Sequence, residues 1–108
     1  MTVPAAPASA AETIEHRFDR LAKVWYADTA HLSSSTKIIN HPAFREIIAI
    51  GTPVVPLVLR ELARGPSLWV WALPAITGAD PVPASDCGDI AKMTEAWLRW
   101  ARDHGYQR

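Results

Sequence analysis

A chain of 108 residues is long enough for one domain, and its 49% hydrophobic and 20% charged residues are typical of a globular protein. Its 11 basic and 11 acidic residues cancel, so it lacks the basic excess of most nucleic-acid binders, and we expect no nucleic-acid partner. No apolar run approaches the ~20 residues of a membrane-spanning helix, and we expect no membrane association. The single cysteine, Cys87, allows no intrachain disulfide and predicts a reducing, cytoplasmic location.

The first third of the chain is predicted to hold a tail and one long helix. Residues 1–8 are rich in proline and alanine and lack the basic and apolar regions of a signal peptide, so we expect a disordered tail before a single all-helical domain over residues 9–108. Ser9 and Glu12 have the spacing of a capping box, which predicts a helix from about residue 10 to residue 28. Its apolar face carries Ile14, Phe18, Leu21, Ala22 and Trp25.

A polar loop is expected over residues 29–40, and a short helix follows it. Asn40 or His41 is its predicted N-cap, and Gly51 ends it. Its apolar face consists of Phe44, Ile47 and Ile48.

The next helix is predicted to begin immediately after Gly51. Thr52 has the properties of an N-cap, Pro53 suits the first helical position, and Gly65 followed by Pro66 is a typical helix stop. The stripe predicted to be buried consists of Val55, Val58, Leu59 and Leu62.

The chain is predicted to be organised around the eleven uncharged residues from Leu68 to Gly78. Ser67 is a plausible N-cap and Gly78 a C-terminal glycine, which together delimit a helix. A helix that is apolar on every side is normally buried on every side, so we expect other helices to surround this one. Pro74 lies inside it and predicts a kink or an early end near residues 71–73.

The last helix is expected to follow a proline-bearing loop over residues 79–88. Asp89 or Asp86 begins it and Gly105 ends it. Its inner face carries Ile90, Met93, Trp97, Trp100 and Ala101. The pass along the chain indicates no strand, and the pattern predicts an all-α domain of about five helices, with two helical hairpins and a docked N-terminal helix.

Two parts of the chain resemble the HEAT-like repeat family. The stretch from Gly51 to Leu62 has a glycine-proline turn followed by aliphatic residues that end in a Leu-x-x-x-Leu spacing. A Thr77-Gly78 turn, a loop and then a final helix with paired tryptophans is similar to the end of bacterial HEAT-like proteins. The resemblance covers about residues 40–105.

This resemblance implies a scaffold of HEAT-like hairpins that binds another protein and has no catalysis of its own. Such short bacterial proteins often serve as regulatory, antitoxin-like or immunity-like partners. The resemblance implies no cofactor. Stacked repeats usually need at least three units, so a homo-oligomer that covers the open end of the stack is an alternative.

Four residues are the candidates for binding a partner. Trp69 and Trp71 lie about 200° apart on a helix, so they cannot both fill the same side. Either the central helix is sandwiched between two layers, or one indole reaches the surface, where tryptophan is enriched at binding hot spots. Arg60 and Arg64, with Arg45, could form a small basic patch, although exposed arginines usually make only a solvated face.

An enzymatic alternative depends on Arg99 and His104. Their spacing matches the Arg-x-x-x-x-His motif of the HEPN ribonucleases, in which a histidine would transfer a proton and an arginine would stabilise phosphate charge. The competing interpretation is that His104 stands at a helix C-terminus, which favours a positive imidazole.

The other reactive side chains predict no site. Cys87 is interpreted as an ordinary loop thiol, and His41 as a helix cap. His16 and His31 have no companion at metal-ligand spacing, and the aspartates around residues 80–89 lack the spacing of a calcium loop, so we expect no metal.

Overall fold

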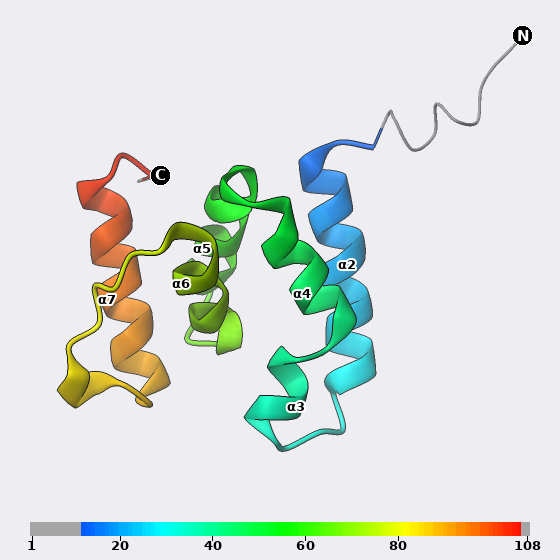
Figure 1. The fold of residues 1–108 in the computed structure, drawn as a ribbon, viewed down its shortest axis with the longest axis horizontal. Coiled ribbons are helices and arrows are strands. Elements are labelled where there is room, and N and C mark those ends of the chain that lie inside the picture. Colours follow the sequence, from blue (N-terminus) through cyan, green and yellow to red (C-terminus); the bar gives the residue numbers. More distant parts are fainter. Residues whose placement is uncertain (1–11, 107–108) are drawn as a thin grey trace, which may run out of the picture.

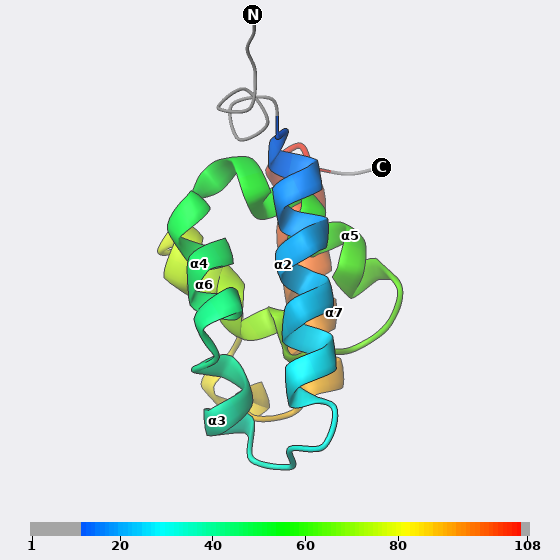
Figure 2. The same ribbon diagram turned by 90° about the vertical axis from the view of Figure 1, so that its right-hand side faces the viewer.

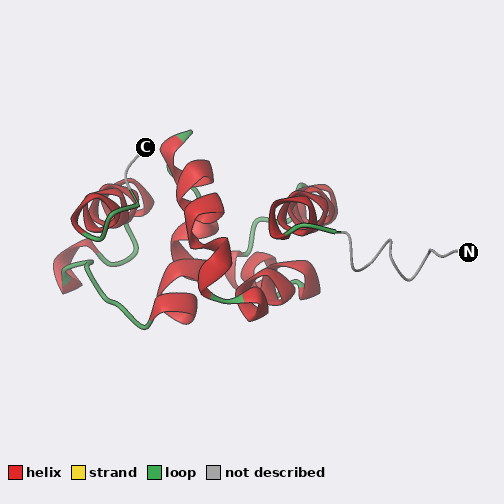
Figure 3. Ribbon diagram, turned by 90° about the horizontal axis from the view of Figure 1, so that it is seen from above, coloured by secondary structure: helices red, strands yellow, loops and turns green. Residues whose placement is uncertain are grey.

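Caps and proline positions set most boundaries of the fold. The computed structural model describes residues 12–106, and every regular element in that range is helical, which confirms the predicted all-α class (Figure 3). The elements are α2 (Ile14–Thr29), α3 (Ser35–Ile39), α4 (Pro42–Ile50), η1 (Thr52–Val54), α5 (Val55–Ala63), η2 (Leu68–Trp71), α6 (Ala72–Thr77), η3 (Ala84–Asp86) and α7 (Ile90–Asp103), where η denotes a 3₁₀ helix.

The first long helix begins later than predicted. Thr13 is its N-cap: its backbone is extended, and its hydroxyl accepts a hydrogen bond from the His16 amide at 3.0 Å. Glu12 forms an ion pair with Arg20, at 2.8 Å between Arg20 Nε and Glu12 Oε2. The predicted cap Ser9 and the predicted tail over residues 1–8 lie outside the described residues.

The predicted loop over residues 29–40 contains a short helix, so that prediction was wrong in part. Ser34 caps α3, because its hydroxyl accepts from the Lys37 amide at 3.4 Å. The indole N–H of Trp25 in α2 holds α3 in place by donating a hydrogen bond of 2.7 Å to the carbonyl of Ile38. A helix of five residues depends on such tertiary contacts, because it is too short to be stable alone.

The cap of α4 is His41, one of the two residues predicted, but the next helix does not start as predicted. His41 Nδ1 accepts from the Ala43 amide at 3.0 Å, with Pro42 at the first helical position. Thr52 makes no capping bond; it opens the 3₁₀ turn η1, which leads into α5. Between the two helices the chain turns through 103° at Gly51, whose φ of +90° favours glycine. The first expected hairpin, α4 with α5, therefore does not form an antiparallel pair of helices.

The central segment is two helical pieces, and the break lies where Pro74 predicts it. Residues Leu68–Trp71 form η2 and Ala72–Thr77 form α6. This arrangement places Pro74 in the first turn of α6, where its missing N–H costs little. Ser67 and Gly78 cap the segment as predicted, and Gly78 adopts the left-handed φ of +75°.

The helices form three layers, with the central segment and α5 in the middle. Figure 1 shows α7 on one side of this middle layer and α2 with α4 on the other. Figure 2 shows α2 in front, with α4 and α6 to one side of it and α5 to the other. Helices therefore pack on both sides of the central segment, as in the sandwich alternative. The segment is not buried on every side as expected, because Ala75 is exposed and Trp71 is only partly buried.

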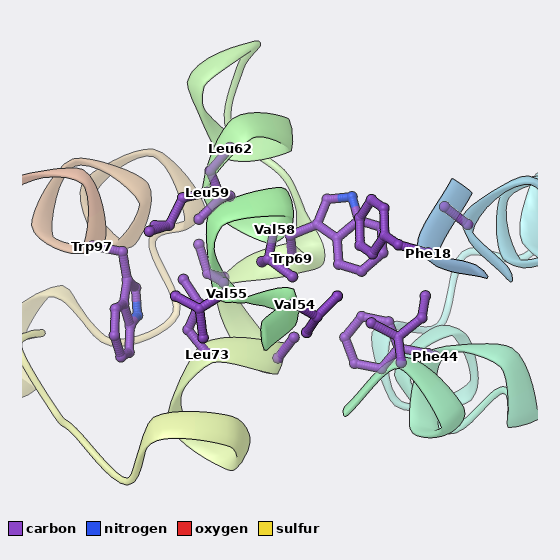
Figure 4. Close-up of a cluster of buried hydrophobic side chains, with 14 of the residues drawn as sticks. Phe18, Phe44, Val54, Val55, Val58, Leu59, Leu62, Trp69, Leu73 and Trp97 are labelled. Carbon is purple, nitrogen blue, oxygen red and sulfur yellow. The ribbon is translucent and has the colours of Figure 1, made fainter. Parts of the chain in front are cut away.

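The core lies on both faces of the middle layer. Figure 4 shows Trp69 directed toward Phe18 of α2 and Phe44 of α4, while Leu73 lies toward Trp97 of α7. All the predicted stripe residues of α5 are buried in it. The buried hydrophobic residues of the middle layer are Val54, Val55, Val58, Leu59, Leu62, Trp69, Val70, Ala72 and Leu73.

Asp89, one of the two predicted starts, is the N-cap of the last helix, and its carboxylate accepts from the Lys92 amide at 3.1 Å. Met93, Trp97 and Ala101 of its predicted inner face are buried. Within residues 12–106, no single helix is both long and apolar enough to cross a membrane, and one bent pair, α4 with η1 and α5, reaches that length and composition.

Candidate functional site

Trp71 is one of two tryptophans that the core leaves partly uncovered; the other is Trp100. Trp71 is half-buried, at the end of η2. Among the described residues its indole N–H has no hydrogen-bond partner, and its ring is the one tryptophan ring without an aromatic neighbour in stacking or edge contact. Part of this indole is thus available to another molecule.

The first of two grooves beside Trp71 lies between α4 and α6, and we call it the α4–α6 groove. It encloses about 380 Å³. Its apolar lining consists of Ile39, Phe44, Ile48, Ala49, Trp71 and Ala75. Its polar lining is Asn40 and Arg45, which are joined by a hydrogen bond of 3.2 Å from Arg45 Nη1 to Asn40 Oδ1. The guanidinium has no carboxylate partner among the described residues.

The second groove lies between α6 and α7, and we call it the α6–α7 groove. It encloses about 320 Å³. Its apolar lining consists of Trp71, Pro74, Val82, Ala84, Met93 and Trp97. Asp80 is its one charged lining residue, and Cys87 contributes an exposed thiol. Trp71 lines both grooves, and Ala75 and Pro74 of α6 line one groove each, so we call the two grooves together the apolar strip.

The structure separates the two tryptophans that the sequence placed together as candidates. Trp69 is only 1% exposed, and its ring lies 4.7 Å from that of Trp25 and 5.1 Å from that of Phe18. It is therefore a core residue and is not available to a partner. Trp71, two residues later, is only partly buried and remains a candidate for binding a partner.

Trp69 also begins a chain of polar contacts that ties α2 to α5. Its Nε1–H donates to the Tyr26 hydroxyl at 2.7 Å, and that hydroxyl donates to Glu61 Oε1 at 3.2 Å. Burial, and then the nearby Glu61 carboxylate, raise the pKa of Tyr26 above its usual value, against the opposing effect of the Trp69 bond. This contact joins residues 43 positions apart, so local sequence patterns could not predict it.

The two predicted arginines of α5 are largely engaged within the chain. Arg60 donates to Glu15 Oε2 and to Asp19 Oδ1, each at 3.1 Å, and it also faces Glu61. Burial lowers the pKa of Arg60, but the carboxylates outweigh it and hold the pKa above its usual value. Arg64 pairs with Glu61 at 3.3 Å and is otherwise solvated. Neither lines a groove beside Trp71, so the predicted basic patch is a set of intramolecular ion pairs.

The residues of the enzymatic alternative lie at the exposed end of α7. His104 caps the helix, with its Nδ1 2.9 Å from the carbonyl of Trp100 and its ring stacked on that indole at 4.3 Å. Helical positions five apart differ by about 140° in direction, which turns Arg99 away from His104. Neither residue lines the grooves described above.

The remaining reactive side chains have structural roles or none. His41 caps α4 and bonds through Nε2 to Asp28 Oδ2 at 3.0 Å. Asp89 caps α7, and Asp86 lies 3.9 Å from Lys92. Across the part of the chain that the structure describes, no three histidine, cysteine, aspartate or glutamate residues gather as they would around a metal ion.

No family model, no curated protein and no solved structure matches this chain.

Proposed function

We propose that this chain is a non-catalytic protein-binding module and that Trp71 is the central anchor of its binding surface. The observation that carries the proposal is the position of Trp71, half-buried between two apolar grooves and without an aromatic or hydrogen-bonding partner among the described residues. Tryptophans in such positions are enriched among the few residues that dominate binding energy.

The composition supports the same proposal. Net charge near zero favours association over electrostatic repulsion. The glycine turns at Gly51 and Gly78, and the paired tryptophans of the last helix, are features that resemble HEAT-like proteins, which mostly present helical surfaces to other proteins. On that analogy the partner is another cytoplasmic protein that this chain regulates, in an antitoxin-like or immunity-like manner.

The proposal is tested by affinity capture from the source cells with matched variants. Ala75→Glu places a charge in the α4–α6 groove at an exposed position, so it disturbs the surface without removing core packing. Val24→Glu is the control, because Val24 is 43% exposed on α2 and lines neither groove. A stoichiometric protein should be retained by the wild type and by Val24→Glu and lost with Ala75→Glu. Equal retention by all three would refute a surface at Trp71.

Self-association is separated from hetero-association by light scattering. A monomer mass at working concentration excludes a stable homo-oligomer, whereas a dimer that Ala75→Glu dissociates would make a second copy the partner.

A further inference from the structure

The two grooves beside Trp71 carry opposite charges, and this distinguishes one class of partner from others. Arg45 is the one charged residue that lines the α4–α6 groove, and Asp80 the one that lines the α6–α7 groove. Among the described residues neither has an ion-pair partner, and both are exposed. Opposite charges in two apolar grooves that share Trp71 are complementary to an apolar segment that carries an acid on one side of that tryptophan and a base on the other.

The shape of the strip favours a helix as that segment. Two apolar grooves that share one large side chain can receive a row of apolar side chains from one face of a helix, as packed helices do. Ala75, which lines the first groove, is small and exposed, so a second helix can approach α6 closely there. An added strand would need a free sheet edge, and the described residues contain no sheet.

We infer that the strip binds an amphipathic helix of a partner protein, whose apolar anchors fill the two grooves on either side of Trp71, with a carboxylate at Arg45 and a basic side chain at Asp80. This inference rests on the proposed function and deepens it, because it specifies the partner's chemistry. The apolar contacts with Trp71 supply most of the affinity, and the two charges select the partner.

The probes are three tryptophan-free helical peptides with the same leucine stripe at i, i+4, i+7 and i+11. One carries Glu at one end and Lys at the other, one carries Glu at both ends, and one carries Lys at both ends. Binding is followed through the indole N–H signal of Trp71 in heteronuclear NMR spectra, assigned with Trp71→Phe. The wild type should bind the mixed peptide about two- to fivefold more tightly than either of the others, as expected for each solvent-exposed ion pair.

Charge reversal on the protein then tests the assignment of each end. Arg45→Glu should transfer the preference to the peptide with two lysines, and Asp80→Lys to the peptide with two glutamates; both residues are exposed, so the fold should tolerate these changes. If all three peptides bind with equal affinity, and substitution of Trp71 weakens that binding, the roles assigned to Arg45 and Asp80 are overturned and the proposed function stands. No binding of any peptide would overturn the helix as occupant, while the capture experiment would still decide the proposed function by itself.

Discussion

The Tyr26 hydroxyl should stabilise this fold far more than its exposure suggests. Tyr26 is 46% exposed, and substitutions at such surface positions usually change the free energy of unfolding by no more than about 0.5 kcal/mol. Its oxygen, however, accepts the N–H of the buried Trp69 at 2.7 Å. Tyr26→Phe keeps the ring and removes that acceptor, which leaves a buried donor unpaired.

An unpaired buried donor costs about 1–3 kcal/mol. We expect Tyr26→Phe to lower the free energy of unfolding by about 1–2 kcal/mol, because the Trp69 N–H lies at the edge of the core. A loss of 1 kcal/mol lowers Tm by about 4–8 °C in a domain of this size. Urea and thermal unfolding, followed by far-ultraviolet circular dichroism, measure both quantities.

Tyr106→Phe is the matched control. The Tyr106 ring stacks on Trp100 at 5.6 Å, and its hydroxyl makes no hydrogen bond within residues 12–106, so the change should cost less than about 0.5 kcal/mol. A double-mutant cycle of Tyr26→Phe with Trp69→Phe should give a coupling of about 1 kcal/mol. If Tyr26→Phe is as stable as Tyr106→Phe and the coupling is zero, the reasoning is refuted.

Three further predictions concern the pKa of Tyr26, the N-cap of α7 and the ribonuclease alternative. The pKa of Tyr26 is higher in the folded than in the unfolded state, so its contribution to stability is complete below pH about 10 and is lost as pH rises through the folded value. Between pH about 10 and the folded pKa, the free energy of unfolding should therefore fall less steeply with pH for Tyr26→Phe than for wild type. Asp89→Ala removes the N-cap of α7 and should cost about 0.5–2 kcal/mol in urea unfolding, whereas Asp86→Ala, which loses only a 3.9 Å contact with Lys92, should cost less than half of that. The purified wild type should cleave no RNA; cleavage that Arg99→Ala or His104→Ala abolishes would instead establish the ribonuclease alternative.

Helix ends could be predicted from the sequence where a side chain or a glycine determines them locally. His41, Asp89, Ser67 and Gly78 all cap the helices that their sequence neighbours suggest. The short α3 could not be predicted, because Trp25, which bonds to it from α2, is 13 residues away. The angle of 103° between α4 and the helix after it was equally hidden, since hydrophobic periodicity identifies a buried face and leaves the angle between helices open.

The candidate site could likewise be predicted from the sequence only in its local features. A spacing of two residues on an apolar helix predicts that Trp69 and Trp71 face different ways, and the structure agrees. Which of them faces the core depends on where Phe18 and Phe44 lie, and residues far along the chain determine that. The same long-range arrangement determines that Arg45 lines one groove and Asp80 the other.

The central claim is that a protein partner binds at Trp71, and the affinity of the captured partner for matched variants tests it most directly. Isothermal titration calorimetry should give the wild type and Val24→Glu the same Kd, because Val24 lies outside both grooves. Ala75→Glu and Trp71→Ala should each weaken binding about 30-fold or more, the equivalent of a hot-spot loss of about 2 kcal/mol. Unchanged Kd values for both variants, with their folds intact by circular dichroism, would contradict the account.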